Sequence, residues 1–367
     1  MHLQRLKIKG GWKVEIEHGG RSVSRLWIVD RSMRIGHKTV RVGGIAGVGT
    51  DPAHRNKGLA SQVLNQAIEL MGEKGYDLSF LFGIQDFYPR FGFATCMAER
   101  RFSMDTRAAE RVQKGPAMRP LGKGAAAKRA LEQIRRMHNR LNRARTGAVV
   151  RGASWDGFPM AAGFGVEPKV FVWENAKGKV GAYAVLDDRT DRCRAAEVGA
   201  ESAEGQAAAI RLLARRAVAL RRERIQVCMP ADSEFALYCR SLGAADETRY
   251  ERNAGPMARI INLKSTLAKL EPVWRERWPK GPGLKLQTDL GSVRLVRQGG
   301  GIRVDEGGSA KGGARMGQAA LVQALLGYRS TDDLARSGEI AASRQAQRAL
   351  ASLFPLQEAH MSWPDRF

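Results

Sequence analysis

The chain has 367 residues, 43% of them apolar and 27% charged, which excludes a wholly disordered chain and allows two or three domains. Its 61 Lys and Arg against 37 Asp and Glu give a net charge of +24, which attracts phosphates and nucleic acids but is more often the charge of an Arg-rich, solvated surface. No apolar run reaches the roughly 18 residues of a membrane-spanning helix, so an integral membrane protein of the helical kind is excluded.

Alternating polar and apolar residues separated by Gly turns predict an antiparallel meander in the first region, residues 1–107. The expected elements, in chain order, are strands at 12–17, 23–29, 39–42 and 45–50, a helix at 59–71 and a strand at 78–82. Apolar residues that recur every three or four positions indicate the helix, and Gly72 marks its end.

The second region, residues 108–259, begins with a basic linker and then repeats the order of strands, helix, strand and helix. Its expected elements are helices at 129–142, 207–222 and 233–242 and strands at 170–173, 181–186, 195–199 and 225–229. We interpret this order as an internal duplication of the fold. The third region, residues 260–367, is predicted to be a small α+β domain. Its expected elements are helices at 263–277, 316–326 and 343–353 and short strands within 284–304.

The most informative stretch is the loop between the fourth predicted strand and the first long helix. It carries Arg55, Asn56, Lys57 and Gly58 just before the helix begins. The first turn of a helix has unpaired N–H groups and the positive end of the helix dipole, and this arrangement binds a pyrophosphate. Gly58 allows the backbone to approach a phosphate because it has no Cβ, and the two cations add donors. An ordinary strand-to-helix loop is the alternative interpretation.

The spacing Arg55-x-x-Gly58-x-Ala60 resembles the (Arg/Gln)-x-x-Gly-x-(Gly/Ala) signature of GNAT acetyltransferases. The resemblance implies that this loop holds the pyrophosphate of acetyl-coenzyme A. It also implies that the pantetheine pairs with the exposed edge of the preceding strand, from Val48 to Thr50. The cofactor-binding residues implied in this way are Val48, Thr50, Arg55, Asn56, Lys57, Gly58, Leu59 and Ala60.

A second match narrows the family. The segment from Phe87 to Phe93, FYPRFGF, resembles the Tyr-x-Arg-Phe-Gly-(Tyr/Phe) segment of GNAT enzymes of the enhanced intracellular survival type. That type combines a GNAT domain, a degenerate second GNAT domain and a C-terminal sterol carrier protein-like domain. The resemblance therefore implies an α/β (α+β) fold with tandem mixed sheets flanked by helices, and it covers nearly the whole chain. The domains would be 1–107, 108–259 and 260–367, the second without a cofactor.

The resemblance also implies the roles of two residues in a transfer of acetyl to a primary amine. Tyr88 would be the general acid, because a phenol with a reference pKa of about 10 is protonated at neutral pH. The α-carboxylate of Phe367 would be the general base, either directly or through water, although its reference pKa of about 3.5 makes it a weak one. The alternative for Tyr88 is simple packing at a strand end, and the alternative for Phe367 is a frayed tail. The backbone N–H near Val48 would stabilise the oxyanion.

One departure from the family concerns the start of the chain. A complete GNAT domain has a strand and two helices before the meander, whereas this chain starts almost at the meander. We therefore expect the first domain to lack that strand and those helices, which form one wall of the acceptor pocket. The acceptor is not identified by the sequence, and a charge of +24 disfavours polycations such as aminoglycosides.

Six scattered histidines and four cysteines without a CxxC pair give no metal-ligand spacing, so no metal is expected. Free thiols and the lack of a signal peptide favour a cytoplasmic protein. A homo-oligomer is expected from the resemblance alone. Two other functions stay open: a non-enzymatic basic module on a GNAT shell and a lipid-binding protein. The positive charge leaves nucleic acid open as a partner, but no nucleic-acid-binding motif supports it.

Overall fold

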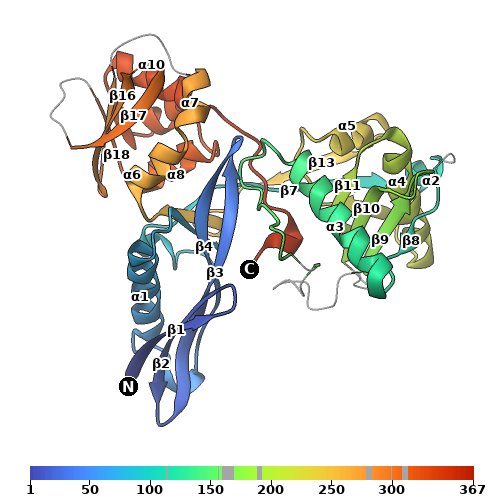
Figure 1. Ribbon diagram of the computed structural model, residues 1–367, viewed down its shortest axis with the longest axis horizontal. Coiled ribbons are helices and arrows are strands. Elements are labelled where there is room, and N and C mark those ends of the chain that lie inside the picture. Colours follow the sequence, from blue (N-terminus) through green and yellow to red (C-terminus); the bar gives the residue numbers. More distant parts are fainter. Residues whose placement is uncertain are drawn as a thin grey trace.

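The computed structural model describes residues 1–112, 115–155, 157–158, 169–187, 192–277, 283–298, 300–307 and 313–367. Three mixed β-sheets organise these residues, as Figure 1 shows, with helices packed on each sheet. This is the α/β (α+β) class with tandem sheets that the sequence predicts. Within the described residues, no helix is both long and apolar enough to cross a membrane.

Sheet A contains seven strands in the order β1-β2-β3-β4-β5-β14-β6. These strands are β1 (His2–Ile8), β2 (Gly11–His18), β3 (Arg21–Ile35), β4 (Lys38–Thr50), β5 (Leu78–Gly83), β6 (Ala94–Thr95) and β14 (Gly255–Ile260). The segments predicted at 39–42 and 45–50 are one continuous strand, β4, because β3 pairs along its whole length. Between β4 and β5 lie the short 3-10 helix η1 (Pro52–His54) and α1 (Leu59–Glu73), and η2 (Pro89–Phe91) follows β5.

The start of sheet A corrects one expectation from the sequence. A strand does precede the meander, since β1 pairs in antiparallel register with the whole of β2, from His2 with Glu17 to Ile8 with Gly11. The two strands are joined by a tight turn at Gly10, whose φ of 78° favours glycine. The first helical element of sheet A's region is η1, which begins at Pro52.

Sheet B contains seven strands in the order β13-β7-β12-β11-β10-β9-β8. These strands are β7 (Glu99–Asp105), β8 (Arg119–Pro120), β9 (Lys169–Glu174), β10 (Val180–Asp187), β11 (Cys193–Ala200), β12 (Arg224–Val227) and β13 (Ala245–Arg249). The helices of this region are α2 (Thr106–Glu110), α3 (Gly124–Leu141), α4 (Ala203–Ala219) and α5 (Glu234–Ser241). As in sheet A, one parallel strand pair lies in an otherwise antiparallel sheet.

The first two regions exchange strands across the expected boundaries at 107 and 259. β7, from the first region, pairs with β12 and β13 in sheet B. In return, β14 lies between β5 and β6 in sheet A. The sequence gives no sign of this exchange. Each of the two sheets therefore includes a strand from the other region, and the chain passes between the sheets at both places.

Sheet C forms the C-terminal part with the order β17-β16-β15-β18-β19. Its strands are β15 (Leu284–Thr288), β16 (Gly291–Gln298), β17 (Gly301–Glu306), β18 (Ala314–Met316) and β19 (Ile340–Ala342). Its helices are α6 (Leu263–Lys269), α7 (Glu271–Arg277), α8 (Gln318–Leu325), α9 (Thr331–Arg336) and α10 (Arg344–Leu353). The helix predicted at 263–277 is thus two helices. After α10 the chain runs to η3 (Trp363–Asp365) and ends at Phe367 between sheets A and B, as Figure 1 shows.

A buried carboxylate joins sheet A to the C-terminal part. Asp77, just before β5, is fully buried and accepts hydrogen bonds from the Arg41 backbone N–H at 2.6 Å and the Ser265 hydroxyl at 2.6 Å. The ammonium group of Lys269 lies 2.6 Å and 2.8 Å from its two oxygens. A buried carboxylate is stable only when it is paired and hydrogen-bonded in this way.

We predict that Asp77→Asn lowers the free energy of unfolding by about 1–3 kcal/mol, because the amide cannot accept all four hydrogen bonds from the three donor groups and leaves Lys269 without a charged partner. Chemical denaturation measures this loss. Acetyl-coenzyme A affinity should not change, because Asp77 lies outside the site described below. A variant as stable as the parent protein would contradict the prediction.

Candidate active site

β4 and β5 are paired over only a short distance and then separate. Their parallel register covers Val42 with Leu78, Gly43 with Ser79 and Gly44 with Phe80. Beyond these pairs, β4 continues to Thr50 bonded to β3, while β5 continues bonded to β14. The facing edges of the two strands therefore have free backbone N–H and C=O groups. An extended amide-containing ligand can pair with such an edge as an added strand.

A β-bulge interrupts β4 within this separated part. Arg25 of β3 pairs with Gly49 and Trp27 pairs with Ala46, so that two residues of β4 oppose one of β3. The two are Gly47, which has a φ of 55°, and Val48. A Cβ on Gly47 would come within 2.5 Å of the Trp27 ring, so the bulge requires glycine. Bulges of this kind release backbone groups from the ladder and often lie beside active sites.

The loop after β4 presents its polar residues to solvent. Arg55, Asn56, Lys57 and Gly58 are all exposed, whereas the Leu59 side chain is buried in the core and only its backbone faces the loop. Asn56 and Gly58 have φ values of 60° and 74°, which turn the chain sharply into α1. The guanidinium of Arg55 donates to the Thr50 carbonyl at 3.4 Å, and Lys57 donates to the Ala53 carbonyl at 3.3 Å.

The N-terminus of α1 has no side-chain cap, because its N-cap residue is Gly58. The matching helix of sheet B differs, since Ser202 caps α4 by accepting a hydrogen bond from the Gly205 N–H at 3.2 Å. The first N–H groups of α1 are therefore left for an external acceptor. Together with the dipole and the nearby cations, they form a site suited to an anion such as a pyrophosphate.

Tyr88 lies on the face of sheet A that α1 covers. Alternate residues of a strand point to opposite faces, and Leu81 and Gly83 of β5 point to the α1 side, where Leu81 joins the core around that helix. A Cβ on Gly83 would come within 2.6 Å of the Tyr88 ring, so the ring packs on this glycine. Tyr88 is 8% exposed, and its burial raises the pKa of the phenol above 10, which keeps it protonated.

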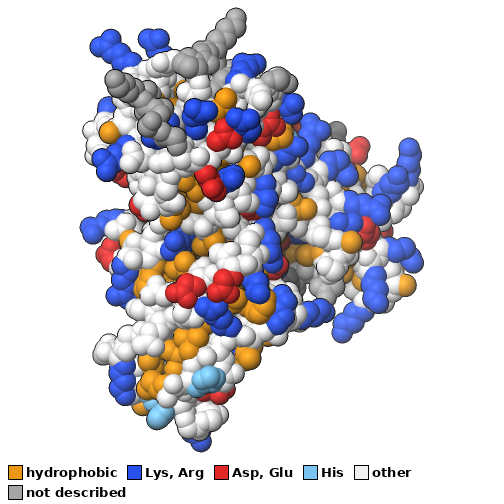
Figure 2. Space-filling model, turned by 60° about the vertical axis from the view of Figure 1, so that its left-hand side comes forward, with side chains coloured by type: hydrophobic (Ala, Val, Ile, Leu, Met, Phe, Trp, Pro, Cys, Tyr) orange, Lys and Arg blue, Asp and Glu red, His pale blue; other side chains and the backbone are white. Residues whose placement is uncertain are grey.

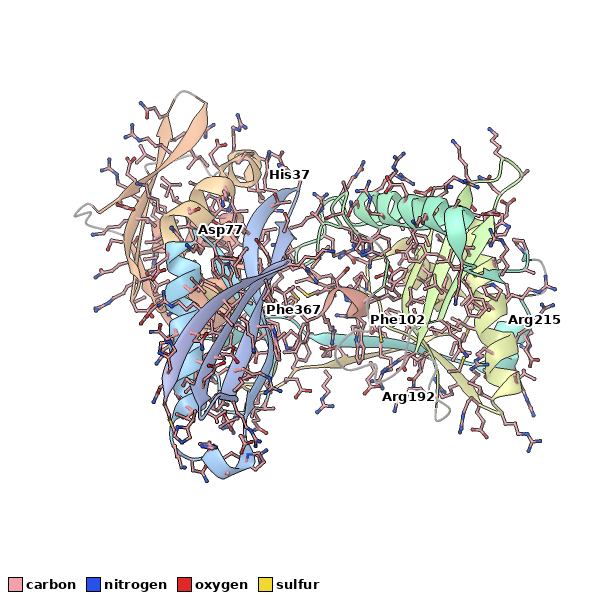
Figure 3. All side chains as sticks on the ribbon, turned by 60° about the horizontal axis from the view of Figure 1, so that its bottom comes forward. His37, Asp77, Phe102, Arg192, Arg215 and Phe367 are labelled. Atoms are coloured by element: carbon pink, nitrogen blue, oxygen red, sulfur yellow. The ribbon has the colours of Figure 1, made fainter. Side chains whose placement is uncertain are left out.

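Phe367 lies on the opposite face of sheet A. A Cβ on Gly44 would come within 2.6 Å of the Phe367 ring, whereas a Cβ on the neighbouring Gly43 would meet Met71 of α1. The Phe367 ring also packs against Phe80 and Phe82, with centroid distances of 6.2 Å and 6.0 Å. Figure 3 shows Phe367 beside these strands. The last residue is therefore seated where β4 and β5 separate, and Tyr88 approaches from the other face.

A cluster of buried ions holds the C-terminal segment. The fully buried guanidinium of Arg151 donates to both oxygens of Glu197, at 2.9 Å and 2.6 Å, and to both oxygens of Asp365, at 2.9 Å and 3.1 Å. Tyr183 donates to Glu197 at 2.6 Å. His138 donates through Nε2 to the Val149 carbonyl, 3.1 Å away, and its ring nitrogens lie 3.6 Å from each carboxylate.

This cluster has a clear electrostatic character. Burial opposes ionisation of Glu197, but its interactions with the Arg151 guanidinium and with His138 outweigh the burial and hold the pKa of Glu197 well below its usual range. In the described part of the chain, His138, Glu197 and Asp365 are the one set of side chains close enough to share a metal ion. The Arg151 guanidinium already binds both carboxylates of the set, so the cluster functions as an ion-pair network.

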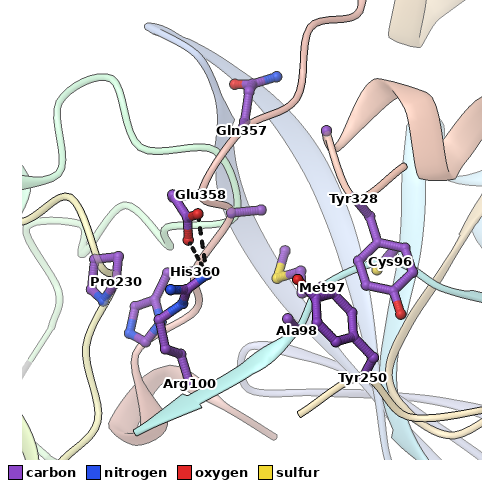
Figure 4. Close-up of a pocket in the computed structure, with 12 residues that line it drawn as sticks. Cys96, Met97, Ala98, Arg100, Pro230, Tyr250, Tyr328, Gln357, Glu358 and His360 are labelled. Carbon is purple, nitrogen blue, oxygen red and sulfur yellow. Dashed lines mark hydrogen bonds and ion pairs between the residues drawn. The ribbon is translucent and has the colours of Figure 1, made fainter. Parts of the chain in front are cut away.

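Two cavities adjoin the C-terminal segment. One, of about 280 Å³, lies between the sheets and has both acidic and basic walls; its lining includes Glu99, Arg101, Glu247, Arg249, Glu251, Trp363 and Arg366. The other, shown in Figure 4, has a volume of about 50 Å³ and is lined by Arg100, Tyr250, Tyr328, Glu358 and His360, among others. Burial lowers the pKa of His360 to about 3. Neither Tyr88 nor Phe367 lines either cavity, so neither cavity is assigned to the amine acceptor.

The structure places Tyr88 against Gly83 of β5 and Phe367 against Gly44 of β4, on opposite faces of sheet A. Val48 lies in the bulge further along β4, and the loop residues follow the end of that strand. Sequence reasoning missed Arg151, Glu197 and Asp365, which lie far apart in the sequence and match no motif. The basic residues show no single stripe: in Figure 2, Lys and Arg side chains are spread over the whole visible face.

Known protein families match two parts of the chain. The family described as acetyltransferase (GNAT) domain matches residues 3–96, and the family described as sterol carrier protein domain matches residues 286–362. The chain therefore contains a GNAT acetyltransferase domain and a C-terminal sterol carrier protein-like domain. Both matches confirm the resemblance that the motifs indicate.

Solved structures share this fold over nearly the whole chain. A probable N-acyltransferase from Enterococcus faecalis V583 has a TM-score of 0.79 at 15% identity, covering 98% of this chain and 90% of that one. A GCN5-related N-acetyltransferase from Anabaena variabilis ATCC 29413 has a TM-score of 0.75 at 16% identity, covering 97% and 89%. Eis1 from Mycobacterium abscessus has a TM-score of 0.70 at 18% identity, covering 99% and 92%. At such identities the likeness shows the fold. No curated protein sequence matches the chain.

We predict that Glu197→Gln destabilises the protein by about 3–5 kcal/mol at pH 7, because it removes one partner of a buried ion pair. The folded-state pKa of Glu197 lies well below its usual value of 4.5. The parent protein therefore keeps its extra stability over the variant above about pH 4.5 and loses it as the pH falls through the folded-state pKa. Melting temperatures at pH 7, 5, 4 and 3 should therefore converge in acid. Glu69→Gln, at an exposed ion pair with Arg5, should change little at any pH. A constant difference across pH would contradict the prediction.

Proposed function

We propose that this enzyme transfers acetyl from acetyl-coenzyme A to a primary amine, with Tyr88 as general acid and the Phe367 α-carboxylate as general base. The observation that carries the proposal is the separation of β4 from β5, which Tyr88 and Phe367 flank from opposite faces. Two groups that act on opposite sides of one reacting carbon need such a placement. The transfer itself also fits the GNAT domain match.

The chain offers a fitting place for acetyl-coenzyme A. The exposed Arg55, Asn56, Lys57 and Gly58 and the uncapped N–H groups of Leu59 and Ala60 would hold the pyrophosphate. The free edge of β4 from Val48 to Thr50 would pair with the pantetheine amides. When bound, the coenzyme supplies an acetyl thioester.

Each proposed catalytic group has one task. The Phe367 carboxylate accepts the proton that the amine nitrogen loses as the new N–C bond forms. The bulge at Gly47 and Val48 provides a backbone N–H that stabilises negative charge on the carbonyl oxygen. Tyr88 donates its proton to sulfur as the C–S bond breaks, and its raised pKa suits an acid that must stay protonated.

Two alternatives are less well supported. A basic module without catalysis has no need for an uncapped α1, a tyrosine and a seated C-terminus around one opening. A lipid carrier would need an apolar tunnel in the C-terminal part, but the cavity of about 380 Å³ described there is lined by Asp289, Arg315 and Glu339. Nucleic acid as a partner has no further support, because the basic residues form no stripe on the face in Figure 2.

We also propose that the protein is cytoplasmic and forms a homo-oligomer. All four cysteines are buried free thiols, which is typical of a reducing compartment and favours the cytoplasm. The family resemblance favours a homo-oligomer, and the exposed Leu6 and Ile8 of β1 offer apolar surface for it. Light scattering of the purified protein measures the assembly directly.

We predict that Gly58→Ala weakens acetyl-coenzyme A binding about tenfold or more. Alanine is strained at a φ of 74°, and its Cβ would stand where the phosphates approach the α1 N-terminus. Titration calorimetry measures the affinity. Gly75→Ala is the matched control: it has a φ of 67° and similarly open surroundings but lies beyond the other end of α1. Equal affinities in the two variants would contradict a phosphate site at Gly58.

We predict that Tyr88→Phe and an extension by two residues past Phe367 each lower kcat about 100-fold or more, since each removes one proton-transfer group. Release of free thiol from acetyl-coenzyme A, followed with a panel of primary amines, measures turnover and names the acceptor class. Coenzyme affinity should stay within about threefold. Because burial raises the pKa of Tyr88, deprotonation of this acid should not lower the parent rate between pH 7 and 9.

The outcomes separate the parts of the proposal. If the parent protein binds the coenzyme but acetylates no amine, the acceptor assignment fails. If Tyr88→Phe keeps the parent rate, another group protonates the thiolate. If the protein does not bind acetyl-coenzyme A at all, the enzymatic proposal gives way to the basic binding module.

A further inference from the structure

Sheet B repeats the strand separation that forms the candidate active site in sheet A. β11 and β12 pair in parallel over Cys193 with Ile225, Arg194 with Gln226 and Ala195 with Val227. β11 then runs on to Ala200 bonded to β10, while β12 ends at Val227. A bulge follows the last parallel pair, since Ala195 pairs with Leu186 and Glu197 with Val185. Sheet B therefore has a counterpart of the opening between β4 and β5.

This counterpart has no anion site of the α1 kind. The helix that follows β11 is α4, and its own Ser202 already accepts the N–H of Gly205. The residues before α4 also lack the Arg-x-x-Gly-x-Ala spacing. The opening in sheet B is thus unsuited to a pyrophosphate-bearing ligand.

The C-terminal segment of the same chain occupies this opening. Trp363 packs on Ala196, the bulge residue of β11. The Arg194 guanidinium lies 4.4 Å from the Trp363 ring centroid, a cation–π contact. Two residues further on, Asp365 joins Arg151, which also binds Glu197 next to the bulge. η3 therefore fills the site in sheet B that corresponds to the active site in sheet A.

The anchor lies very close to the end of the chain. Two residues span at most about 7 Å, so a fixed Asp365 restricts where the Phe367 carboxylate can lie. Arg366 adds a second restraint, with its guanidinium 2.9 Å from Glu99 and 4.4 Å from the Phe82 ring centroid. Misplacement of a reacting group by about 1 Å can cost 100-fold in rate.

We propose that sheet B is the receptor for the chain's own C-terminal segment, and that Arg151, Glu197 and Asp365 are positioning residues for the Phe367 carboxylate. This inference rests on the proposed role of that carboxylate as base. The degenerate second domain thereby contributes to catalysis without binding a coenzyme. The opening between β11 and β12 holds η3 in place, and the ion pairs of Arg151 with Glu197 and Asp365 fix the position of Phe367.

The test is a double-mutant cycle on kcat in the full-length protein, with Asp365→Asn and the two-residue extension past Phe367 made singly and together. Asp365→Asn alone should lower kcat about tenfold or more and leave acetyl-coenzyme A affinity unchanged. If Asp365 acts only through the carboxylate, Asp365→Asn costs nothing further in the extended chain. If the double variant instead loses kcat by the product of the two single losses, Asp365 does not act through the Phe367 carboxylate and the positioning role is overturned.

Asp77→Asn is the matched control, because it also disturbs a buried carboxylate with a cationic partner but lies away from the C-terminal segment. Asp77→Asn should change kcat by no more than about twofold, both in the parent chain and in the chain extended past Phe367. A fall in kcat similar to that of Asp365→Asn would assign both effects to general instability and would overturn the proposal. If the extension alone leaves kcat unchanged, the role of the carboxylate as base fails, and the positioning role fails with it.

A second measurement needs no turnover. Carboxypeptidase should release Phe367 slowly from the parent protein and at least tenfold faster from Asp365→Asn, because the anchor no longer holds the segment. Arg151→Lys keeps the charge but loses the bidentate contacts, and it serves if Asp365→Asn fails to fold. Release at the parent rate from a folded variant would show that the network does not hold the terminus.

Discussion

Arg151 is a fully buried guanidinium that two carboxylates share, and the placement of the chain's end depends on it. Transfer of such ions out of water costs several kcal/mol each, so the network is stable only when all its partners are in place. If Asp365 left, Arg151 and Glu197 would remain with an incomplete set of partners in the interior. This makes the docked position of the C-terminal segment strongly preferred over partly docked ones.

The strand exchange connects sheet B, which holds the anchor at Asp365, to sheet A. β7 is bonded into sheet B and β14 into sheet A, so the chain links the two sheets just before each of these strands. The C-terminal segment bridges the two openings, with Trp363 and Asp365 in sheet B and the Phe367 ring in sheet A.

The two openings illustrate how one fold supports two uses. Each consists of three parallel residue pairs followed by a bulge. They differ where the next helix begins, since Gly58 leaves the N–H groups of α1 free and Ser202 caps α4. The N-cap residue, together with the cationic loop that only α1 has, distinguishes a site suited to an anion from a surface that accepts a protein segment.

The sequence by itself determined the features that depend on local chain chemistry. The strand, loop and uncapped helix around Arg55 and Gly58 follow from hydrophobic periodicity and turn residues within about 20 positions, and the FYPRFGF segment identifies the family. Only the tertiary structure decided the strand exchange, the continuous β4, the presence of β1 and the network of Arg151, Glu197 and Asp365. Arg151 binds partners 46 and 214 residues away. Such pairs are set by the packing of whole sheets, which leaves no periodic or local signal in the sequence.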